Sequence, residues 1–157
     1  MRIELHDRTA DTVVTYFQMT RDPAVCRYLP QKAKSEQEAL DDFEKTRRPG
    51  CSSYGRTVYA DGRYVGDVWC YGIQREEPNA MVSYCIFERS YWGRGIATKA
   101  LKLFLAEVKT KFCAGTFGAF TFSENESSIR VLLKNGFTCV ETFTEDAAES
   151  KYFQKKC

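Results

Sequence analysis

The chain of 157 residues contains a single histidine, His6, and none of its cysteines form a C-x-x-C pair. One histidine cannot supply a cluster of imidazole metal ligands, and it makes a Ser-His-Asp triad hard to build. The seven cysteines are odd in number and widely spread, which argues against a disulfide framework. We therefore expect no bound metal, and mostly reduced thiols packed as small apolar groups.

A long apolar run and a strong charge bias are also lacking. No run reaches the roughly 18–20 apolar residues of a membrane span, and the first residues have no signal-peptide core. The 23 basic and 21 acidic side chains leave a formal net charge of only +2. A nucleic-acid binder usually carries a stronger basic bias. The composition predicts a cytoplasmic protein whose main partner is neither a membrane nor a nucleic acid.

Hydrophobic residues make up 43% of the chain, enough for the core of one domain spanning residues 1–157. Strand patterns are expected at 2–6, 57–60, 63–73, 81–87, 117–122, 138–144 and 151–155. Helical patterns are expected at 11–19, from Ser35, at 95–111 and at 125–134, with a loop or broken helix at 21–34. These elements predict an α/β domain with a mixed sheet and about four helices.

Local signals support several of these boundaries. Asp61-Gly62 predicts a hairpin turn. Ser35 followed by Glu38 predicts a capping box, in which each side chain binds a free backbone N–H of the helix start. Asn125 predicts an N-cap, and Gly136 a C-cap, for the helix at 125–134.

The stretch Trp92-Gly93-Arg94-Gly95-Ile96-Ala97-Thr98 follows an expected strand and opens a long helix. The first turn of a helix presents N–H groups without internal partners, and glycines allow a phosphate to approach the backbone closely. The stretch is not a P-loop, and Thr98 replaces the third glycine or alanine of a Rossmann fingerprint. It predicts either a phosphate cradle or, on the glycines alone, only a tight turn.

Three motifs then occur in order. Residues 22–29 read D-P-A-V-C-R-Y-L, residues 92–101 read W-G-R-G-I-A-T-K-A-L, and Asn125 and Ser128 precede K-N-G-F at 134–137. Together they resemble the GCN5-related N-acetyltransferase (GNAT) superfamily, most closely the branch with the ribosomal-protein N-terminal acetyltransferases. The resemblance implies a mixed, mostly antiparallel sheet of six to seven strands, with about four helices and a splayed parallel strand pair.

The resemblance also implies a cofactor site. Acetyl-coenzyme A would bind where strands 81–87 and 117–122 splay apart, and a backbone amide near residues 83–85 would stabilise the oxyanion. The implied cofactor-binding residues are Tyr84, Cys85, Ile86, Trp92, Gly93, Arg94, Gly95, Ile96, Ala97, Thr98, Asn125 and Ser128.

The implied reaction is direct attack of a primary amine on the thioester within a ternary complex. Many superfamily members place a tyrosine at the position of Leu132 as the acid for the leaving thiolate, and leucine cannot serve. Members of the ribosomal branch often place a serine that faces the thiol at the position of Ser128. The resemblance therefore implies that Ser128 stabilises the thiolate, unless its hydroxyl only belongs to the first turn of its helix. Superfamily members often use a glutamate on the strand at 81–87 as the base, but this strand holds none here. Glu88 follows the strand, and Glu76 and Glu77 precede it. Glu88 is the expected base of these three, unless each is a surface charge.

The expected acceptor is a peptide N-terminal α-amine or a small amine. An α-amine has a pKa of about 7.7–8.0, so a weak or water-mediated base is enough to deprotonate it. The resemblance places the acceptor between residues 21–34 and the last hairpin. Candidate residues there and nearby are Glu145, Asp146, Glu149, Arg8, Tyr28, Trp69 and Tyr71. A drug or polyamine acetyltransferase and a non-catalytic acyl-coenzyme-A-binding module remain alternatives, and a monomer or homodimer is expected.

Overall fold

The computed structural model describes residues 1–29, 33–73 and 76–157, and its centre is a seven-stranded sheet of order β1-β2-β3-β4-β5-β7-β6. The strands are β1 (Ile3–Asp7), β2 (Tyr54–Ala60), β3 (Arg63–Tyr71), β4 (Ala80–Ile86), β5 (Thr116–Phe122), β6 (Thr138–Glu145) and β7 (Ala148–Lys156). All neighbours pair antiparallel except β4 and β5, which are parallel. The expected sheet, mostly antiparallel with one parallel pair, is confirmed.

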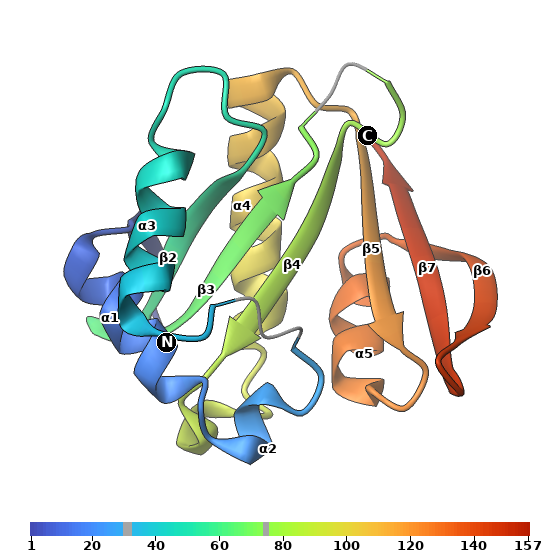
Figure 1. Cartoon of the computed structure of the whole chain (residues 1–157). Coiled ribbons are helices and arrows are strands. Elements are labelled where there is room, and N and C mark those ends of the chain that lie inside the picture. Colours follow the sequence, from blue (N-terminus) through green and yellow to red (C-terminus); the bar gives the residue numbers. More distant parts are fainter. Residues whose placement is uncertain (30–32, 74–75) are drawn as a thin grey trace.

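Helices cover both faces of this sheet (Figure 1). In the described residues they are α1 (Ala10–Met19), α2 (Pro23–Cys26), α3 (Glu36–Thr46), α4 (Ile96–Phe112) and α5 (Glu126–Lys134), with a 3-10 turn η1 (Arg89–Tyr91). α4 and α5 lie on one face, and α1 to α3 lie on the other face beside β1 to β4. None of these helices is long and apolar enough to cross a membrane.

The sequence predicts four of these helices, and α2 is one turn within the segment expected to be a loop or broken helix. Residues 30–32 of that segment lie outside the described residues, as do residues 74–75 of the loop before β4. The capping box at Ser35 is half formed. Ser35 accepts from the Glu38 N–H (3.1 Å), but the Glu38 carboxylate accepts from the Lys34 N–H (3.2 Å). A complete box caps α1 instead, between Thr9 and Thr12.

The apolar stripe of α4 builds the main core. Its buried members, spaced three and four residues apart, are Ile96, Ala100, Leu101, Phe104, Leu105 and Val108. They pack with buried strand residues that include Val58, Val68, Val82, Phe117 and Phe153. Burying one such large side chain contributes about 1.5–3 kcal/mol. This packing fixes the start of α4 beside the end of β4.

The parallel strands β4 and β5 are joined at one end only. Ala80 pairs with Phe117 and Met81 with Gly118, and these two fully described strands share no further paired residues. From there the strands diverge (Figure 1). On its other side β4 remains paired with β3 as far as Ile86. The expected splay is confirmed, and it leaves one backbone edge of β4 open.

Candidate active site

The glycine loop, residues 92–95, leads into α4 beside the open edge of β4. Gly93 and Gly95 have φ values of 77° and 76°, in the left-handed region that favours glycine, and a Cβ on either would meet nothing within 4 Å. Gly95 is the N-cap of α4 and provides no side-chain hydrogen bond to the first turn. The first N–H groups of α4 therefore lack a capping side chain, as in helix-terminal anion sites.

Trp92 attaches this loop to β4. Its indole N–H donates to the carbonyl oxygen of Ile86 at 2.7 Å. The guanidinium of Arg89 lies 5.9 Å from the centre of the Trp92 ring, and that of Arg94 lies 5.2 Å from the centre of the Tyr91 ring. Two cations thus flank the start of α4, an arrangement that suits a pyrophosphate.

Tyr84 bridges the gap between β4 and the first turn of α5. Its hydroxyl lies 2.8 Å from the Ser128 hydroxyl and 3.1 Å from the Ser128 carbonyl oxygen. Burial raises the pKa of Tyr84, so the phenol is neutral at physiological pH. The side-chain oxygen of Asn125 accepts from the Ser128 N–H at 3.2 Å, which makes Asn125 the N-cap of α5. Three contacts therefore hold Ser128, one at its hydroxyl and two at its backbone.

All the cofactor residues expected from the sequence lie on β4, on the loop after it, or in the first turns of α4 and α5. Cys85 differs from its neighbours, since its side chain packs with Val25 and Phe87 on the opposite face from α4. Only the backbone of Cys85 can belong to the open edge. Contact with the cofactor stays a prediction for each of these residues.

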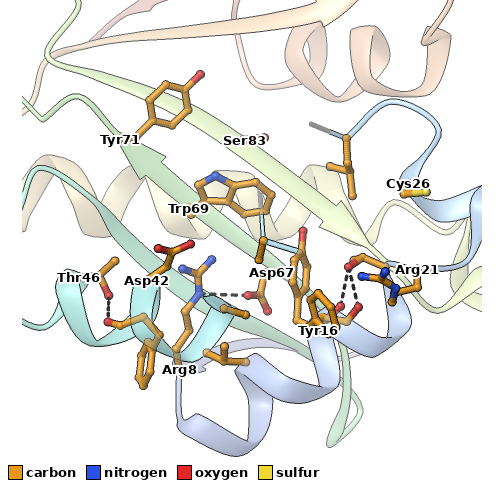
Figure 2. Close-up of a pocket in the computed structure, with 17 residues that line it drawn as sticks. Arg8, Tyr16, Arg21, Cys26, Asp42, Thr46, Asp67, Trp69, Tyr71 and Ser83 are labelled. Carbon is orange, nitrogen blue, oxygen red and sulfur yellow. Dashed lines mark hydrogen bonds and ion pairs between the residues drawn. The ribbon is translucent and has the colours of Figure 1, made fainter. Parts of the chain in front are cut away.

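A cavity of about 360 Å³ opens between α1, α3 and the face of β3 (Figure 2). Its apolar and aromatic lining comprises Val13, Tyr16, Phe17, Cys26, Leu29, Ala33, Ala39, Phe43, Trp69 and Tyr71. Ser83 of β4 also lines it, within the segment expected to provide the oxyanion amide. We call this the aromatic cavity. It leads from the open surface to the strand expected to hold the acetyl group.

The floor of the aromatic cavity holds an ion pair. Arg8 Nε lies 3.1 Å from Asp67 Oδ2, and their side chains are 20% and 4% exposed. The Tyr64 hydroxyl also donates to Asp67. Burial raises the pKa of Asp67, while the bonds from Arg8 and Tyr64 oppose that rise. In the described part of the chain, no group of three His, Cys, Asp or Glu side chains is arranged to hold a metal.

A second cavity, of about 390 Å³, lies where the resemblance placed the acceptor, between the chain after α2 and the last hairpin. It is lined by Arg27, Tyr28, Phe122, Ser123, Glu124, Ala147, Ala148 and Glu149. Of the acceptor residues expected from the sequence, Tyr28 and Glu149 line this cavity, whereas Arg8, Trp69 and Tyr71 line the aromatic cavity. Glu145 and Asp146 line neither.

Glu88, the expected base, lies at the end of β4 and lines neither cavity. Its carboxylate pairs with Arg63 Nη2 at 3.3 Å, and its side chain is 17% exposed. The structure therefore gives Glu88 a partner at the start of β3 and does not bring it together with Ser83. Its catalytic role stays a prediction.

The buried thiols near the site are expected to be inert. Burial raises the pKa of both Cys70 and Cys85 to about 12. Because the thiolate is the reactive form, neither should react with an alkylating reagent in the folded protein at neutral pH. The exposed Cys113, Cys139 and Cys157 should react rapidly. Mass spectrometry of peptides after brief labelling measures this, and labelling of Cys85 as fast as Cys157 would contradict it.

A model of a known family and several solved structures match this chain. The family model, described as an acetyltransferase (GNAT) domain, matches residues 2–138. No curated protein matches the sequence. A solved spermidine N-acetyltransferase from Vibrio cholerae, in complex with CoA and spermine, is 14% identical with a TM-score of 0.87. The alignment covers 98% of this chain and 95% of that chain.

Two further solved structures match over nearly the whole chain. The ribosomal L7/L12 α-N-protein acetyltransferase RimL, in complex with coenzyme A, has 17% identity and a TM-score of 0.82, covering 98% of this chain and 93% of that one. The aminoglycoside acetyltransferase AAC(6')-Ib, in complex with coenzyme A, has 13% identity and a TM-score of 0.82, covering 99% and 95%. At such identities, the likeness establishes a shared fold.

Proposed function

The chain belongs to the acetyltransferase (GNAT) family, and we propose that it moves an acetyl group from acetyl-coenzyme A to a primary amine, either a peptide N-terminal α-amine or a small amine. The main support for this proposal is that β4 pairs with β5 at one end only. It leaves a backbone edge open beside the uncapped start of α4. A cofactor with a pyrophosphate at one end and an extended, amide-containing arm needs both features.

The cofactor's pyrophosphate would bind the N–H groups from Gly93 to Thr98, with Arg94 nearby. Its arm would run along the open edge of β4 toward Ser83. The acceptor amine would arrive from the aromatic cavity, which Ser83 also lines. The two substrates would thus meet from opposite sides of β4, as direct attack in a ternary complex requires.

In the reaction, the neutral amine nitrogen forms a bond to the thioester carbon, and the carbonyl oxygen becomes an oxyanion. A backbone N–H near Ser83 to Cys85 would donate to that oxygen. The carbon–sulfur bond then breaks, and the thiolate leaves. The Ser128 hydroxyl would donate to the thiolate, with Tyr84, 2.8 Å away, positioning it. The proton lost by the amine would pass to water and on to Glu88, the first carboxylate after β4.

We also propose that residues 1–157 act as one acetyltransferase domain, as a monomer or homodimer in the cytoplasm. The support is the composition: a core-forming apolar content and a nearly balanced charge. A base that works through water suits an α-amine, because its ordinary pKa of about 7.7–8.0 leaves part of it neutral at physiological pH.

Acetyl transfer to a panel of amines tests the function. The panel holds short peptides, small primary amines, spermidine and kanamycin, and products are identified by mass spectrometry. We expect transfer to at least one amine, with intersecting lines in double-reciprocal plots at varied concentrations of both substrates. Parallel lines would contradict a ternary complex. Tight binding of acetyl-coenzyme A without transfer to any amine would favour a non-catalytic module.

A further inference from the structure

Arg8 is held in the floor of the aromatic cavity by only one of its guanidinium nitrogens. Nε donates to Asp67 Oδ2 at 3.1 Å, and within the described residues the structure records no other hydrogen bond from this side chain. Figure 2 shows the two Nη atoms on the side of Trp69 and Asp42, away from the bond to Asp67. Because guanidinium is a planar group of five N–H donors, most of its capacity for hydrogen bonds faces the cavity.

Neighbouring groups fix this orientation. A Cβ on Gly55 of β2 would lie 2.7 Å from Arg8 Nε and overlap the guanidinium carbon, so the glycine provides the space that Arg8 occupies. The Arg8 guanidinium carbon lies 5.8 Å from the centre of the Trp69 ring. Asp67 is itself held by the Tyr64 hydroxyl. Arg8 is therefore preorganised, and a ligand that binds it would lose little conformational entropy in the protein.

The other charged groups that line the cavity do not neutralise the positive charge of the Arg8 guanidinium. Asp67 is only 3% exposed and is already bonded to Arg8 and Tyr64. The guanidinium of Arg21 lies over the Phe17 ring, 4.6 Å from its centre. Asp42 is an exposed side chain that pairs with Lys45 at 4.0 Å. A ligand deep in this cavity consequently meets N–H donors on a cation, surrounded by aromatic walls.

We propose that Arg8 binds a carbonyl or carboxylate oxygen of the acceptor. The acceptor is then an amine with such an oxygen a few bonds from its nitrogen, as in an α-amino acid or a peptide N-terminus, and not a polyamine. The inference rests on the proposed function, and it makes Arg8 a specificity-determining residue. A hydrogen bond from a charged donor is roughly twice as strong as a neutral one. Tyr16, Phe17 and Trp69 would pack on an apolar side chain of the same acceptor.

Two probes that differ only in the carbonyl group test this proposal: L-phenylalaninamide and 2-phenylethylamine, with L-phenylalanine and spermidine as further acceptors. Removing Arg8 alone leaves Asp67 buried without its cation and threatens folding. The variants are therefore Asp67→Asn, which keeps Arg8, and the double variant Arg8→Met with Asp67→Asn. The measured quantity is the ratio of kcat/KM for the amide to that for the amine. Comparing this ratio between proteins cancels the difference in basicity between the two probes.

We expect the ratio to fall about tenfold or more from Asp67→Asn to the double variant, as loss of a charge-assisted hydrogen bond predicts. The same ratio is measured with L-phenylalanine in place of the amide. If it falls more than the ratio for the amide, a free carboxylate is the preferred group. If it falls less, a peptide carbonyl is preferred. A ratio that changes less than about twofold, or efficient acetylation of spermidine in all three proteins, overturns the proposal.

These measurements distinguish an error in the proposed role of Arg8 from an error in the proposed acetyltransferase function. Transfer with an unchanged ratio contradicts only the role of Arg8. If no probe is acetylated, binding is measured in a Trp92→Phe background, where Trp69 is the one remaining tryptophan of the two. Quenching of Trp69 fluorescence by L-phenylalaninamide that is lost in the double variant supports the role of Arg8. No quenching up to the solubility limit of the amide overturns that role.

Discussion

Ser128→Ala is expected to lower kcat about a hundredfold while changing the dissociation constant of acetyl-coenzyme A less than about threefold. In the proposed mechanism the hydroxyl donates a hydrogen bond to the thiolate, which exists only late in the reaction, so its loss should raise the barrier more than it weakens ground-state binding. Single-turnover rates and calorimetric titration of the cofactor measure the two effects separately.

Two further variants make this prediction specific. Tyr84→Phe keeps the ring on β4 and removes the hydroxyl that lies 2.8 Å from the Ser128 hydroxyl. It should lower kcat about tenfold, because Ser128 loses its orientation but keeps its own proton. Ser127→Ala, on the exposed side of the same helical turn, should leave kcat unchanged. Full activity of Ser128→Ala would remove this residue from the mechanism.

Gly66→Ala is expected to lower the free energy of unfolding by about 3 kcal/mol. Gly66 lies opposite Ile86 in the pairing of β3 with β4. A Cβ there would overlap the backbone oxygen of Cys85 and lie 2.9 Å from the Ile86 Cα, so backbone must move. The displaced segment is the strand expected to hold the cofactor. Urea unfolding, followed by circular dichroism, measures the loss, and acetyl-coenzyme A should also bind more weakly.

Gly115→Ala is the matched control for Gly66→Ala. Its φ is not in the left-handed region, and the nearest atom to its added Cβ is Asn79 Oδ1 at 4.0 Å. The substitution should be neutral or stabilise by up to about 1 kcal/mol, because it restricts the unfolded chain. Equal midpoints in urea for Gly66→Ala and wild type would show that β3 and β4 are not packed as closely as described.

Local patterns predicted much of this fold. The apolar face of α4 and the N-cap of α5 are determined by residues within one or two helical turns, so the local sequence is nearly sufficient to predict them. Gly93 and Gly95 both adopt the left-handed conformation that the expected loop requires. The splay of β4 and β5 followed from the resemblance, because no local pattern specifies where two strands stop pairing.

Long-range contacts were harder to predict. Asp67 was missed as a cavity residue because an acidic side chain in a strand is usually exposed, and its cation, Arg8, lies 59 residues away in the chain. Tyr84 was predicted to contact the cofactor, but its bond to Ser128 depends on how α5 packs against β4. The pairing of Glu88 with Arg63 likewise depends on the register of β3 with β4.

The thermal midpoint of the purified protein with and without acetyl-coenzyme A is the most direct measurement of the central claim, with ATP and NAD as controls. A ligand at a hundredfold excess over its dissociation constant stabilises the folded state by about 2.7 kcal/mol. For a domain of this size, a rise of about 5–10 °C is expected with acetyl-coenzyme A alone. No rise with saturating acetyl-coenzyme A, or an equal rise with ATP, would contradict a coenzyme A site at β4 and the start of α4.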